Sequence, residues 1–222
     1  MNKLVLIAVF SFLFCFSTKA QDTTNTSNSL LLTPELKAKF TKDGELAVKQ
    51  LENALGNIVD KTRSYDERAK NKENALNLFS TDTNRVEITS VKNQNNKISR
   101  QVKIYLSNLL NLAKKYDAIK ITYFDTRVSN EFIPKTVLDE DGNIVTDEDG
   151  NPVVKYFGYA TFCQVFEART LNASAERIVQ YNIKNIDCKR VQIIIEKMKN
   201  AKDEKVWILR LGDITVEEYN SK

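Results

Sequence analysis

Two hydrophobic periodicities follow each other along this chain, and their order constrains the fold more than any other feature. In the first half, apolar residues recur at three- and four-residue steps from Asp43 to about Val59 and again along 102–116. In the second half, β-branched and aromatic residues alternate in runs at 119–124, 156–169, 181–198 and 206–216. Helices followed by strands predict an α+β fold and not a doubly wound sheet.

Local motifs predict where the first helices begin. Thr33-Pro34-Glu35 combines a capping threonine, a proline at the first helical position and an acid in the first turn. A second start is expected at Asp43, and Ser64 with Glu67 matches a capping box. We therefore expect two helical segments before residue 60 and a polar helix after Ser64.

A short strand is expected at 86–88, followed by a loop at 93–97. Ser99 is expected to cap the next helix. The stripe that this helix should bury consists of Val102, Leu106, Leu109 and Ala113.

The three runs between 156 and 216 are joined by short turn-rich segments, so the strands are expected to pair antiparallel as a meander. The first of these runs is crowded with aromatic residues. They fit either a stacking surface or apolar pocket wall, or a sheet that is partly covered on both faces, by helices on one and by a partner or an extension on the other. These residues are Tyr156, Phe157, Tyr159, Phe162 and Phe166.

Four local strings occur in this order of elements: Ala75-Leu76-Asn77-Leu78-Phe79, Val86-Glu87-Ile88-Thr89-Ser90, Val102-Lys103-Ile104-Tyr105-Leu106 and Trp207-Ile208-Leu209-Arg210-Leu211-Gly212-Asp213-Ile214. Over roughly residues 44–218, the pattern resembles the nuclear transport factor 2-like (cystatin-like, ketosteroid isomerase-like) superfamily. The resemblance implies N-terminal helices packed in a strongly curved antiparallel sheet, a cone whose open end often holds a ligand. Members include isomerases, dehydratases and non-catalytic binding or assembly modules, so the fold alone does not choose a function.

The first twenty residues are typical of an export signal. A charged start at Met1-Asn2-Lys3 precedes an apolar run from Leu4 to Phe16, and small residues then allow cleavage after Ala20. The run is shorter than the roughly 20 residues that a membrane-spanning helix needs. An uncleaved anchor and a lipoprotein modified at Cys15 are the alternatives. We expect a periplasmic or extracellular protein with no integral membrane segment in the mature chain.

The expected organisation is a signal peptide at 1–20, a flexible leader at 21–32 and a single α+β domain at 33–222. An acidic, turn-rich insertion is expected within that domain at 134–153. Removal of the signal takes Lys3 and Lys19 from 33 basic residues, which leaves 31 against 29 acidic ones and a net charge of +2. Because the basic residues are also scattered, nucleic acid is not an expected partner.

The chain contains no histidine. This excludes Ser-His-Asp and Cys-His catalysis, as well as metal sites built on imidazole. The mature chain would keep only Cys163 and Cys188, too few for a four-ligand structural zinc site. No cofactor or metal is expected.

Tyr123 and Asp125 are the catalytic candidates, because steps of two place them on one face of a regular strand. Enzymes of the resembled superfamily commonly use an aspartate with a tyrosine. If that face lines a pocket, Tyr123 would donate a proton and Asp125 would act as general base. Alternatively, Asp125 ends the strand and points to solvent.

The insertion contains an imperfect repeat, in which Asp139-Glu140-Asp141-Gly142-Asn143 is echoed by Asp147-Glu148-Asp149-Gly150-Asn151. The first residues are similar to a calcium loop, but the glycine occupies the fourth position and no glutamate occupies the twelfth. Asp-Gly-Asn also favours a tight turn. We therefore expect hairpin-like turns and no calcium binding.

Cys163 and Cys188 lie on neighbouring expected strands whose midpoint is residue 175.5. A hairpin centred there would place them opposite each other and allow a disulfide. A one-residue shift in register would move one side chain to the other face. Two separate buried thiols are the alternative.

Three functions are compatible with this sequence. The first is an exported non-enzymatic binding or assembly module with an unknown small-molecule or protein partner. The second is an isomerase or lyase that acts on a small apolar carbonyl compound in the cone through Tyr123 and Asp125. The third is a structural subunit that forms a homodimer through an exposed sheet face.

Overall fold

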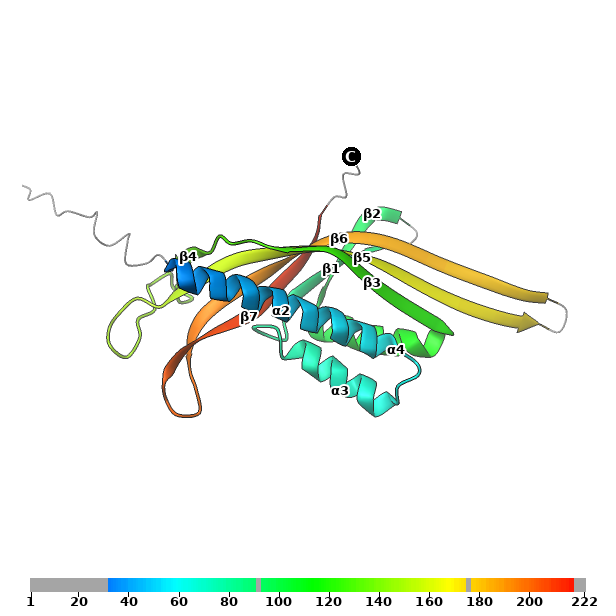
Figure 1. Cartoon of the computed structure of the whole chain (residues 1–222), viewed down its shortest axis with the longest axis horizontal. Coiled ribbons are helices and arrows are strands. Elements are labelled where there is room, and N and C mark those ends of the chain that lie inside the picture. Colours follow the sequence, from blue (N-terminus) through cyan, green and yellow to red (C-terminus); the bar gives the residue numbers. More distant parts are fainter. Residues whose placement is uncertain (1–31, 91–92, 175–176, 218–222) are drawn as a thin grey trace, which may run out of the picture. The chain divides into compact units, whose positions relative to one another are not determined.

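The computed structural model describes residues 32–90, 93–174 and 177–217. The predicted signal peptide and residues 21–31 of the predicted leader lie outside these ranges. The helices are α2 (Pro34–Val59), α3 (Tyr65–Leu76) and α4 (Val102–Lys115). The strands are β1 (Arg85–Ser90), β2 (Asn93–Gln101), β3 (Ala118–Val128), β4 (Ile133–Thr136), β5 (Val154–Ser174), β6 (Arg177–Lys199) and β7 (Lys205–Glu217) (Figure 1). The predicted α+β class is confirmed.

The strands of the described ranges form one open, mixed sheet in the order β2-β1-β7-β6-β5-β3, with β4 also paired to β5. The predicted antiparallel meander of β5, β6 and β7 is confirmed. An entirely antiparallel sheet is a wrong prediction, because β1 pairs parallel with β7 at Val86 and Ile214. β1 and β2 form an antiparallel hairpin near the start of the sheet sequence. β1 then lies beside the last strand, β7, and runs in the same direction as β7.

Strands β5 and β6 form a long ladder in one unbroken register, from Tyr156 opposite Ile195 to Ser174 opposite Arg177. The two residue numbers of every pair have their midpoint at 175.5, which is the hairpin centre that the cysteine spacing predicts. Cys163 and Cys188 are directly opposite and form a disulfide, with Cα atoms 4.0 Å apart. The alternative of two separate thiols is therefore wrong.

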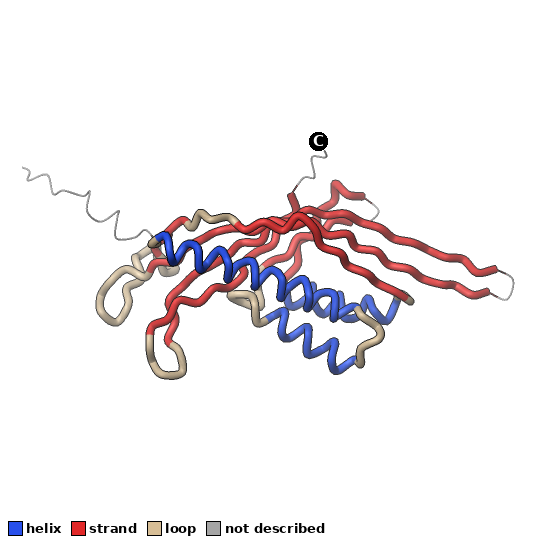
Figure 2. Tube along the Cα trace, in the orientation of Figure 1, coloured by secondary structure: helices blue, strands red, loops and turns tan. Residues whose placement is uncertain are grey.

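The described helices lie on one face of the sheet, here called the inner face (Figure 2). Helix α2 packs on β3, β5 and β7, while α3 packs on α2 and α4. Fully buried side chains from both layers form the core, among them Phe40, Leu51, Ile58, Leu106, Ile193, Ile195 and Leu211. None of the helices in the described ranges has the length and apolar character required to cross a membrane.

Helix α2 begins as predicted, since the Leu36 amide donates to Thr33 Oγ1 over 3.3 Å. The second start predicted at Asp43 is wrong, because the helix continues without a break. Gly44 lies where the helix meets the sheet, and a Cβ added there would be 2.9 Å from Ile193 Cδ1. The glycine therefore permits close packing against the sheet, at the usual cost of about 1 kcal/mol in helix propensity.

Helix α4 buries Val102, Leu106, Leu109 and Ala113, so its predicted stripe is confirmed. Its predicted cap is wrong: Ser99 lies in β2 opposite Glu87, and Gln101 occupies the N-cap position without a side-chain hydrogen bond. The predicted loop at 93–97 is also a strand. Pairing with β1 supplies backbone partners that local composition does not reveal.

Candidate functional site

Asp125 lies at a bulge in β3, where the pairing with β5 shifts between Phe124 and Arg127. Its backbone has a positive φ of 56°, and its exposed carboxylate accepts hydrogen bonds from Arg127 Nε (3.0 Å) and Nη2 (2.8 Å). Tyr123 precedes the bulge and packs against the core from the inner face. The bulge breaks the two-residue period, so the structure does not bring Tyr123 and Asp125 together.

Tyr123 instead lines a groove of about 340 Å³ between α2 and β3, together with Glu52. Glu52 is buried, its Oε1 accepts a hydrogen bond from Thr126 Oγ1 (2.9 Å), and Lys49 Nζ lies 3.7 Å from its Oε2. The Tyr123 hydroxyl is buried and makes no hydrogen bond in the described structure. Burial raises the pKa of Tyr123 well above its ordinary value, with further contributions from Tyr105 and Glu52.

Sequence reasoning missed Glu52, although a signal was present. Glu52 follows Val48 by four residues and precedes Leu55 by three, so it lies on the apolar stripe of α2. A charged residue in such a stripe requires a polar partner inside the protein. Here that partner is Thr126, from the bulged segment of β3.

A second groove, of about 320 Å³, lies between α2 and α3 and is called the amide groove here. It is lined by Gln50, Asn53, Ala54, Asn57, Asn71, Asn74 and Leu78. Asn57 Nδ2 donates to Asn71 Oδ1 over 3.2 Å, and Asn71 Nδ2 donates to the Glu67 carbonyl over 2.8 Å. Asn53 and Asn57 also line the groove that contains Tyr123, so the two grooves flank the same edge of α2.

The inner face of β6 is polar over residues 185–189 and apolar over residues 191–195. Val191, Ile193 and Ile195 are buried in the core, and Asn185, Asp187 and Lys189 continue the same face and are also buried. Two residues of β1, Glu87 and Thr89, make hydrogen bonds to this polar end. These five residues form what is called the polar cluster here: Glu87, Thr89, Asn185, Asp187 and Lys189.

Hydrogen bonds connect the polar cluster across β1 and β6. Asp187 accepts hydrogen bonds from Thr89 Oγ1 and from Asn185 Nδ2, the latter over 3.2 Å. Lys189 Nζ donates to the Glu87 carbonyl over 2.8 Å and lies 4.0 Å from Asp187 Oδ2. The Asn185 Oδ1 atom is buried and makes no hydrogen bond in the described structure.

Burial dominates the electrostatics of this region. It lowers the pKa of Lys189 to about 8, although the charges of Asp187 and Glu87 act in the opposite direction. It raises the pKa of Tyr105, on α4, to about 12, and the charge of Asp187 adds to this effect. Lys189 therefore remains mostly protonated near pH 7 and loses its proton well below the pH at which an exposed lysine does.

The outer face of the sheet is the one opposite the helices. The disulfide lies on this face, in line with Phe124 of β3. Phe124, Tyr159 and Ile186 are 39%, 39% and 43% exposed. The aromatic residues of β5 divide between the faces, with Tyr156, Phe162 and Phe166 in or against the core and Phe157 and Tyr159 on the outer face. Cover of the outer face by a partner or an extension stays a prediction.

The acidic segment forms two tight turns, as predicted. Gly142 and Gly150 have positive φ values of 83° and 77°, and isolated bridges join Leu138 to Ile144 and Thr146 to Pro152. Asp139 and Asp147 each accept hydrogen bonds from backbone amides within their own turn. Gly at these positions avoids the penalty that positive φ imposes on other residues.

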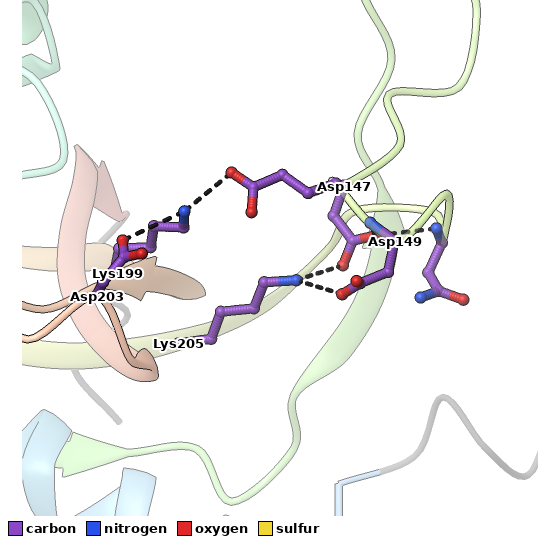
Figure 3. Close-up of polar contacts among 7 residues, drawn as sticks. Asp147, Asp149, Lys199, Asp203 and Lys205 are labelled. Atoms are coloured by element: carbon purple, nitrogen blue, oxygen red, sulfur yellow. Dashed lines mark hydrogen bonds and ion pairs between the residues drawn. The ribbon is translucent and has the colours of Figure 1, made fainter.

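Ion pairs join the second turn to the hairpin between β6 and β7 (Figure 3). Lys205 Nζ lies 3.0 Å from Asp147 Oδ2 and 2.8 Å from Asp149 Oδ2. Lys199 Nζ lies 2.9 Å from Glu148 Oε1 and 3.2 Å from Asp203 Oδ1. The carboxylates of the second turn are therefore engaged by lysines, whereas Asp139 of the first turn accepts hydrogen bonds from backbone amides of its own turn.

Comparison of the chain with known protein families, with curated proteins and with solved structures finds no match. The resemblance to the nuclear transport factor 2-like superfamily, including its cone-shaped sheet, therefore stays a prediction.

Proposed function

We propose that this protein is an exported, non-enzymatic assembly module that pairs with a second copy of itself through the outer face of its sheet. One observation carries the proposal: Phe124, Tyr159 and Ile186 are exposed on a sheet face that no helix of the described ranges covers. Large apolar side chains grouped on one face are typical of protein–protein interfaces.

The charges around these side chains favour a second copy as the partner. Arg127 pairs with Asp125, Arg190 with Glu217 and Lys184 with Glu167, so both signs surround the apolar positions. A two-fold interface places the same surface against itself. A surface of mixed charge can form complementary pairs with its own copy, whereas a surface of one sign would repel it.

The disulfide supports export, since such bonds persist in oxidising compartments. The enzymatic alternative requires Tyr123 and Asp125 in one pocket, and Asp125 instead forms an exposed pair with Arg127.

Analytical ultracentrifugation of the full mature chain tests the proposal, with Ile186→Lys as the disrupting variant. We expect a reversible dimer whose dissociation constant rises about 30-fold or more in the variant, because a buried apolar anchor contributes about 2 kcal/mol. Ile104→Lys on α4 is the matched control, since Ile104 is 45% exposed and lies on a helix. A protein that stays monomeric at every concentration, or equal weakening by both variants, would contradict the proposal.

A further inference from the structure

We propose that the amide groove between α2 and α3 binds a neutral saccharide. This site lies among the helices, on the opposite side of the sheet from the surface proposed for self-association. The two proposals are therefore independent, and each can fail without the other.

The lining of the amide groove is unusual for this chain. Charged residues make up 28% of the sequence, yet no charged residue lines the groove. Five carboxamides from two helices line it instead: Gln50, Asn53 and Asn57 from α2, and Asn71 and Asn74 from α3. A charged ligand would lose hydration there without gaining an opposite charge, so the lining favours a neutral ligand.

Three of the five carboxamides are free to bind a ligand. The side chains of Gln50, Asn53 and Asn74 make no hydrogen bond to any residue of the described structure. Each carboxamide offers two N–H donors and one carbonyl acceptor. A sugar hydroxyl is also both donor and acceptor. Neighbouring hydroxyls can therefore donate to the carboxamide carbonyls or accept from the carboxamide N–H groups.

The rest of the groove holds these groups in place. The Asn57–Asn71 hydrogen bond joins α2 to α3, and the bond from Asn71 to the Glu67 carbonyl fixes its amide. Leu78 contributes an apolar wall and is held by a backbone hydrogen bond from Leu211 of β7, over 2.8 Å. Ala54 is buried beneath the groove. Leu78 and Ala54 provide apolar contact for the C–H face of a sugar ring, and fixed donors reduce the entropy lost on binding.

The dimensions favour a saccharide over an extended peptide. A volume of about 320 Å³ matches the low end of small-molecule sites and suits one or two sugar units. A peptide strand would need a longer groove, with separate pockets for alternate side chains.

Calorimetry and saturation-transfer NMR on the full mature chain test this inference. The probes are N-acetylglucosamine, methyl glucoside and cellobiose, with glucuronate and N-acetyl-trialanine amide as comparators. We expect saturable binding of at least one neutral saccharide with a dissociation constant of about 1 mM or below. Because carboxamides do not titrate, its affinity should stay constant between about pH 5 and pH 8.

Asn53→Leu and Asn74→Leu should each weaken that binding about tenfold, because a lost hydrogen bond leaves a sugar hydroxyl unpaired. Asn108→Leu is the matched control, since Asn108 is an exposed carboxamide of α4 away from the groove, and its affinity should match the native protein. The inference is wrong if no neutral saccharide binds below about 50 mM. Tighter binding of glucuronate, displacement by the peptide, or unchanged affinity in Asn53→Leu would also overturn it.

Discussion

Two lysines of this protein, one exposed and one buried, are paired with aspartates. Lys205 Nζ lies 3.0 Å from Asp147 Oδ2 and 2.8 Å from Asp149 Oδ2, on the surface beside the acidic turns. Lys189 Nζ lies 4.0 Å from Asp187 Oδ2 inside the polar cluster, where the two side chains are 2% and 6% exposed. The shorter contacts belong to the exposed pair.

The two lysines respond to these environments in opposite directions. Hydrogen bonds to Asp149 and Asp147 raise the pKa of Lys205, whereas burial lowers the pKa of Lys189 to about 8. Water screens the exposed pair, so its short distances bring little stability. The buried pair is the more sensitive one, because removal of either partner leaves a charge without water or counter-ion. The distance between nitrogen and oxygen therefore does not indicate which lysine contributes more to stability.

The largest expected effect is that of Lys189→Met. This change should lower the free energy of unfolding at pH 7 by about 3–5 kcal/mol, because Asp187 stays buried without a nearby cation. Urea denaturation followed by circular dichroism measures the loss.

The double variant Lys189→Met/Asp187→Asn is the control for this explanation. It removes both charges, so most of the lost stability should return. A single variant as stable as the native protein would show that the pair does not contribute. A double variant no better than the single one would show that packing, and not charge, explains the loss.

The next effect is a rise in stability with pH. The pKa of Lys189 is about 8 in the folded protein, against 10.5 ordinarily, so the unfolded chain holds more protons between these values. Unfolding free energy should therefore increase by about 2 kcal/mol between pH 8 and pH 10. Above pH 10 the raised pKa of Tyr105 acts in the opposite direction, because the phenol ionises more readily in the unfolded chain. Urea titrations across this range should show the rise in the native protein and lose it in Lys189→Met.

The smallest effect is expected for Lys205→Met, the same substitution at the exposed pair. It should lower stability at pH 7 by less than about 1 kcal/mol. The difference should shrink further in about 1 M salt, where exposed charges are screened within a few ångströms. Thermal and urea denaturation at two salt concentrations test this. A loss as large as that of Lys189→Met would contradict the comparison.

Much of the architecture could be predicted from the sequence, because local rules and core periodicity agree there. The start of α2 at Thr33, the capping box at Ser64 and the buried stripe of α4 all follow from residue type and spacing. The predictions that are wrong concern positions where distant segments meet. No second helix begins at Asp43, because α2 continues through Gly44 in close contact with the sheet, and residues 93–97 form a strand because β1 lies beside them.

The polar cluster could not be predicted, for a related reason. Asn185, Asp187 and Lys189 share strand parity with Val191, Ile193 and Ile195, but charged residues ordinarily face solvent. Ile186 and Cys188 alternate with these polar residues, so the sequence suggests that Ile186 and Cys188 are the buried ones. Besides the contacts among these residues, β1 provides partners, since Thr89 donates to Asp187 and the Glu87 carbonyl accepts from Lys189. The bulge at Asp125 likewise arises from pairing with β5, which the alternation of residues does not reveal.

The single register of β5 and β6 has a consequence for the order of folding events. Its pairs begin at Ser174 and Arg177, neighbours along the chain, and each further pair closes only a slightly larger loop. The parallel contact between Val86 and Ile214, in contrast, must join residues separated by 128 positions. Because closing a longer loop costs more entropy, we expect the hairpin to zip outward early and β1 to join β7 late. Pulse-labelled hydrogen exchange would show this order as early protection of β5 and β6. The two cysteines would then meet while most of the chain is still unfolded, so oxidation would select the correct strand alignment before the last strand arrives.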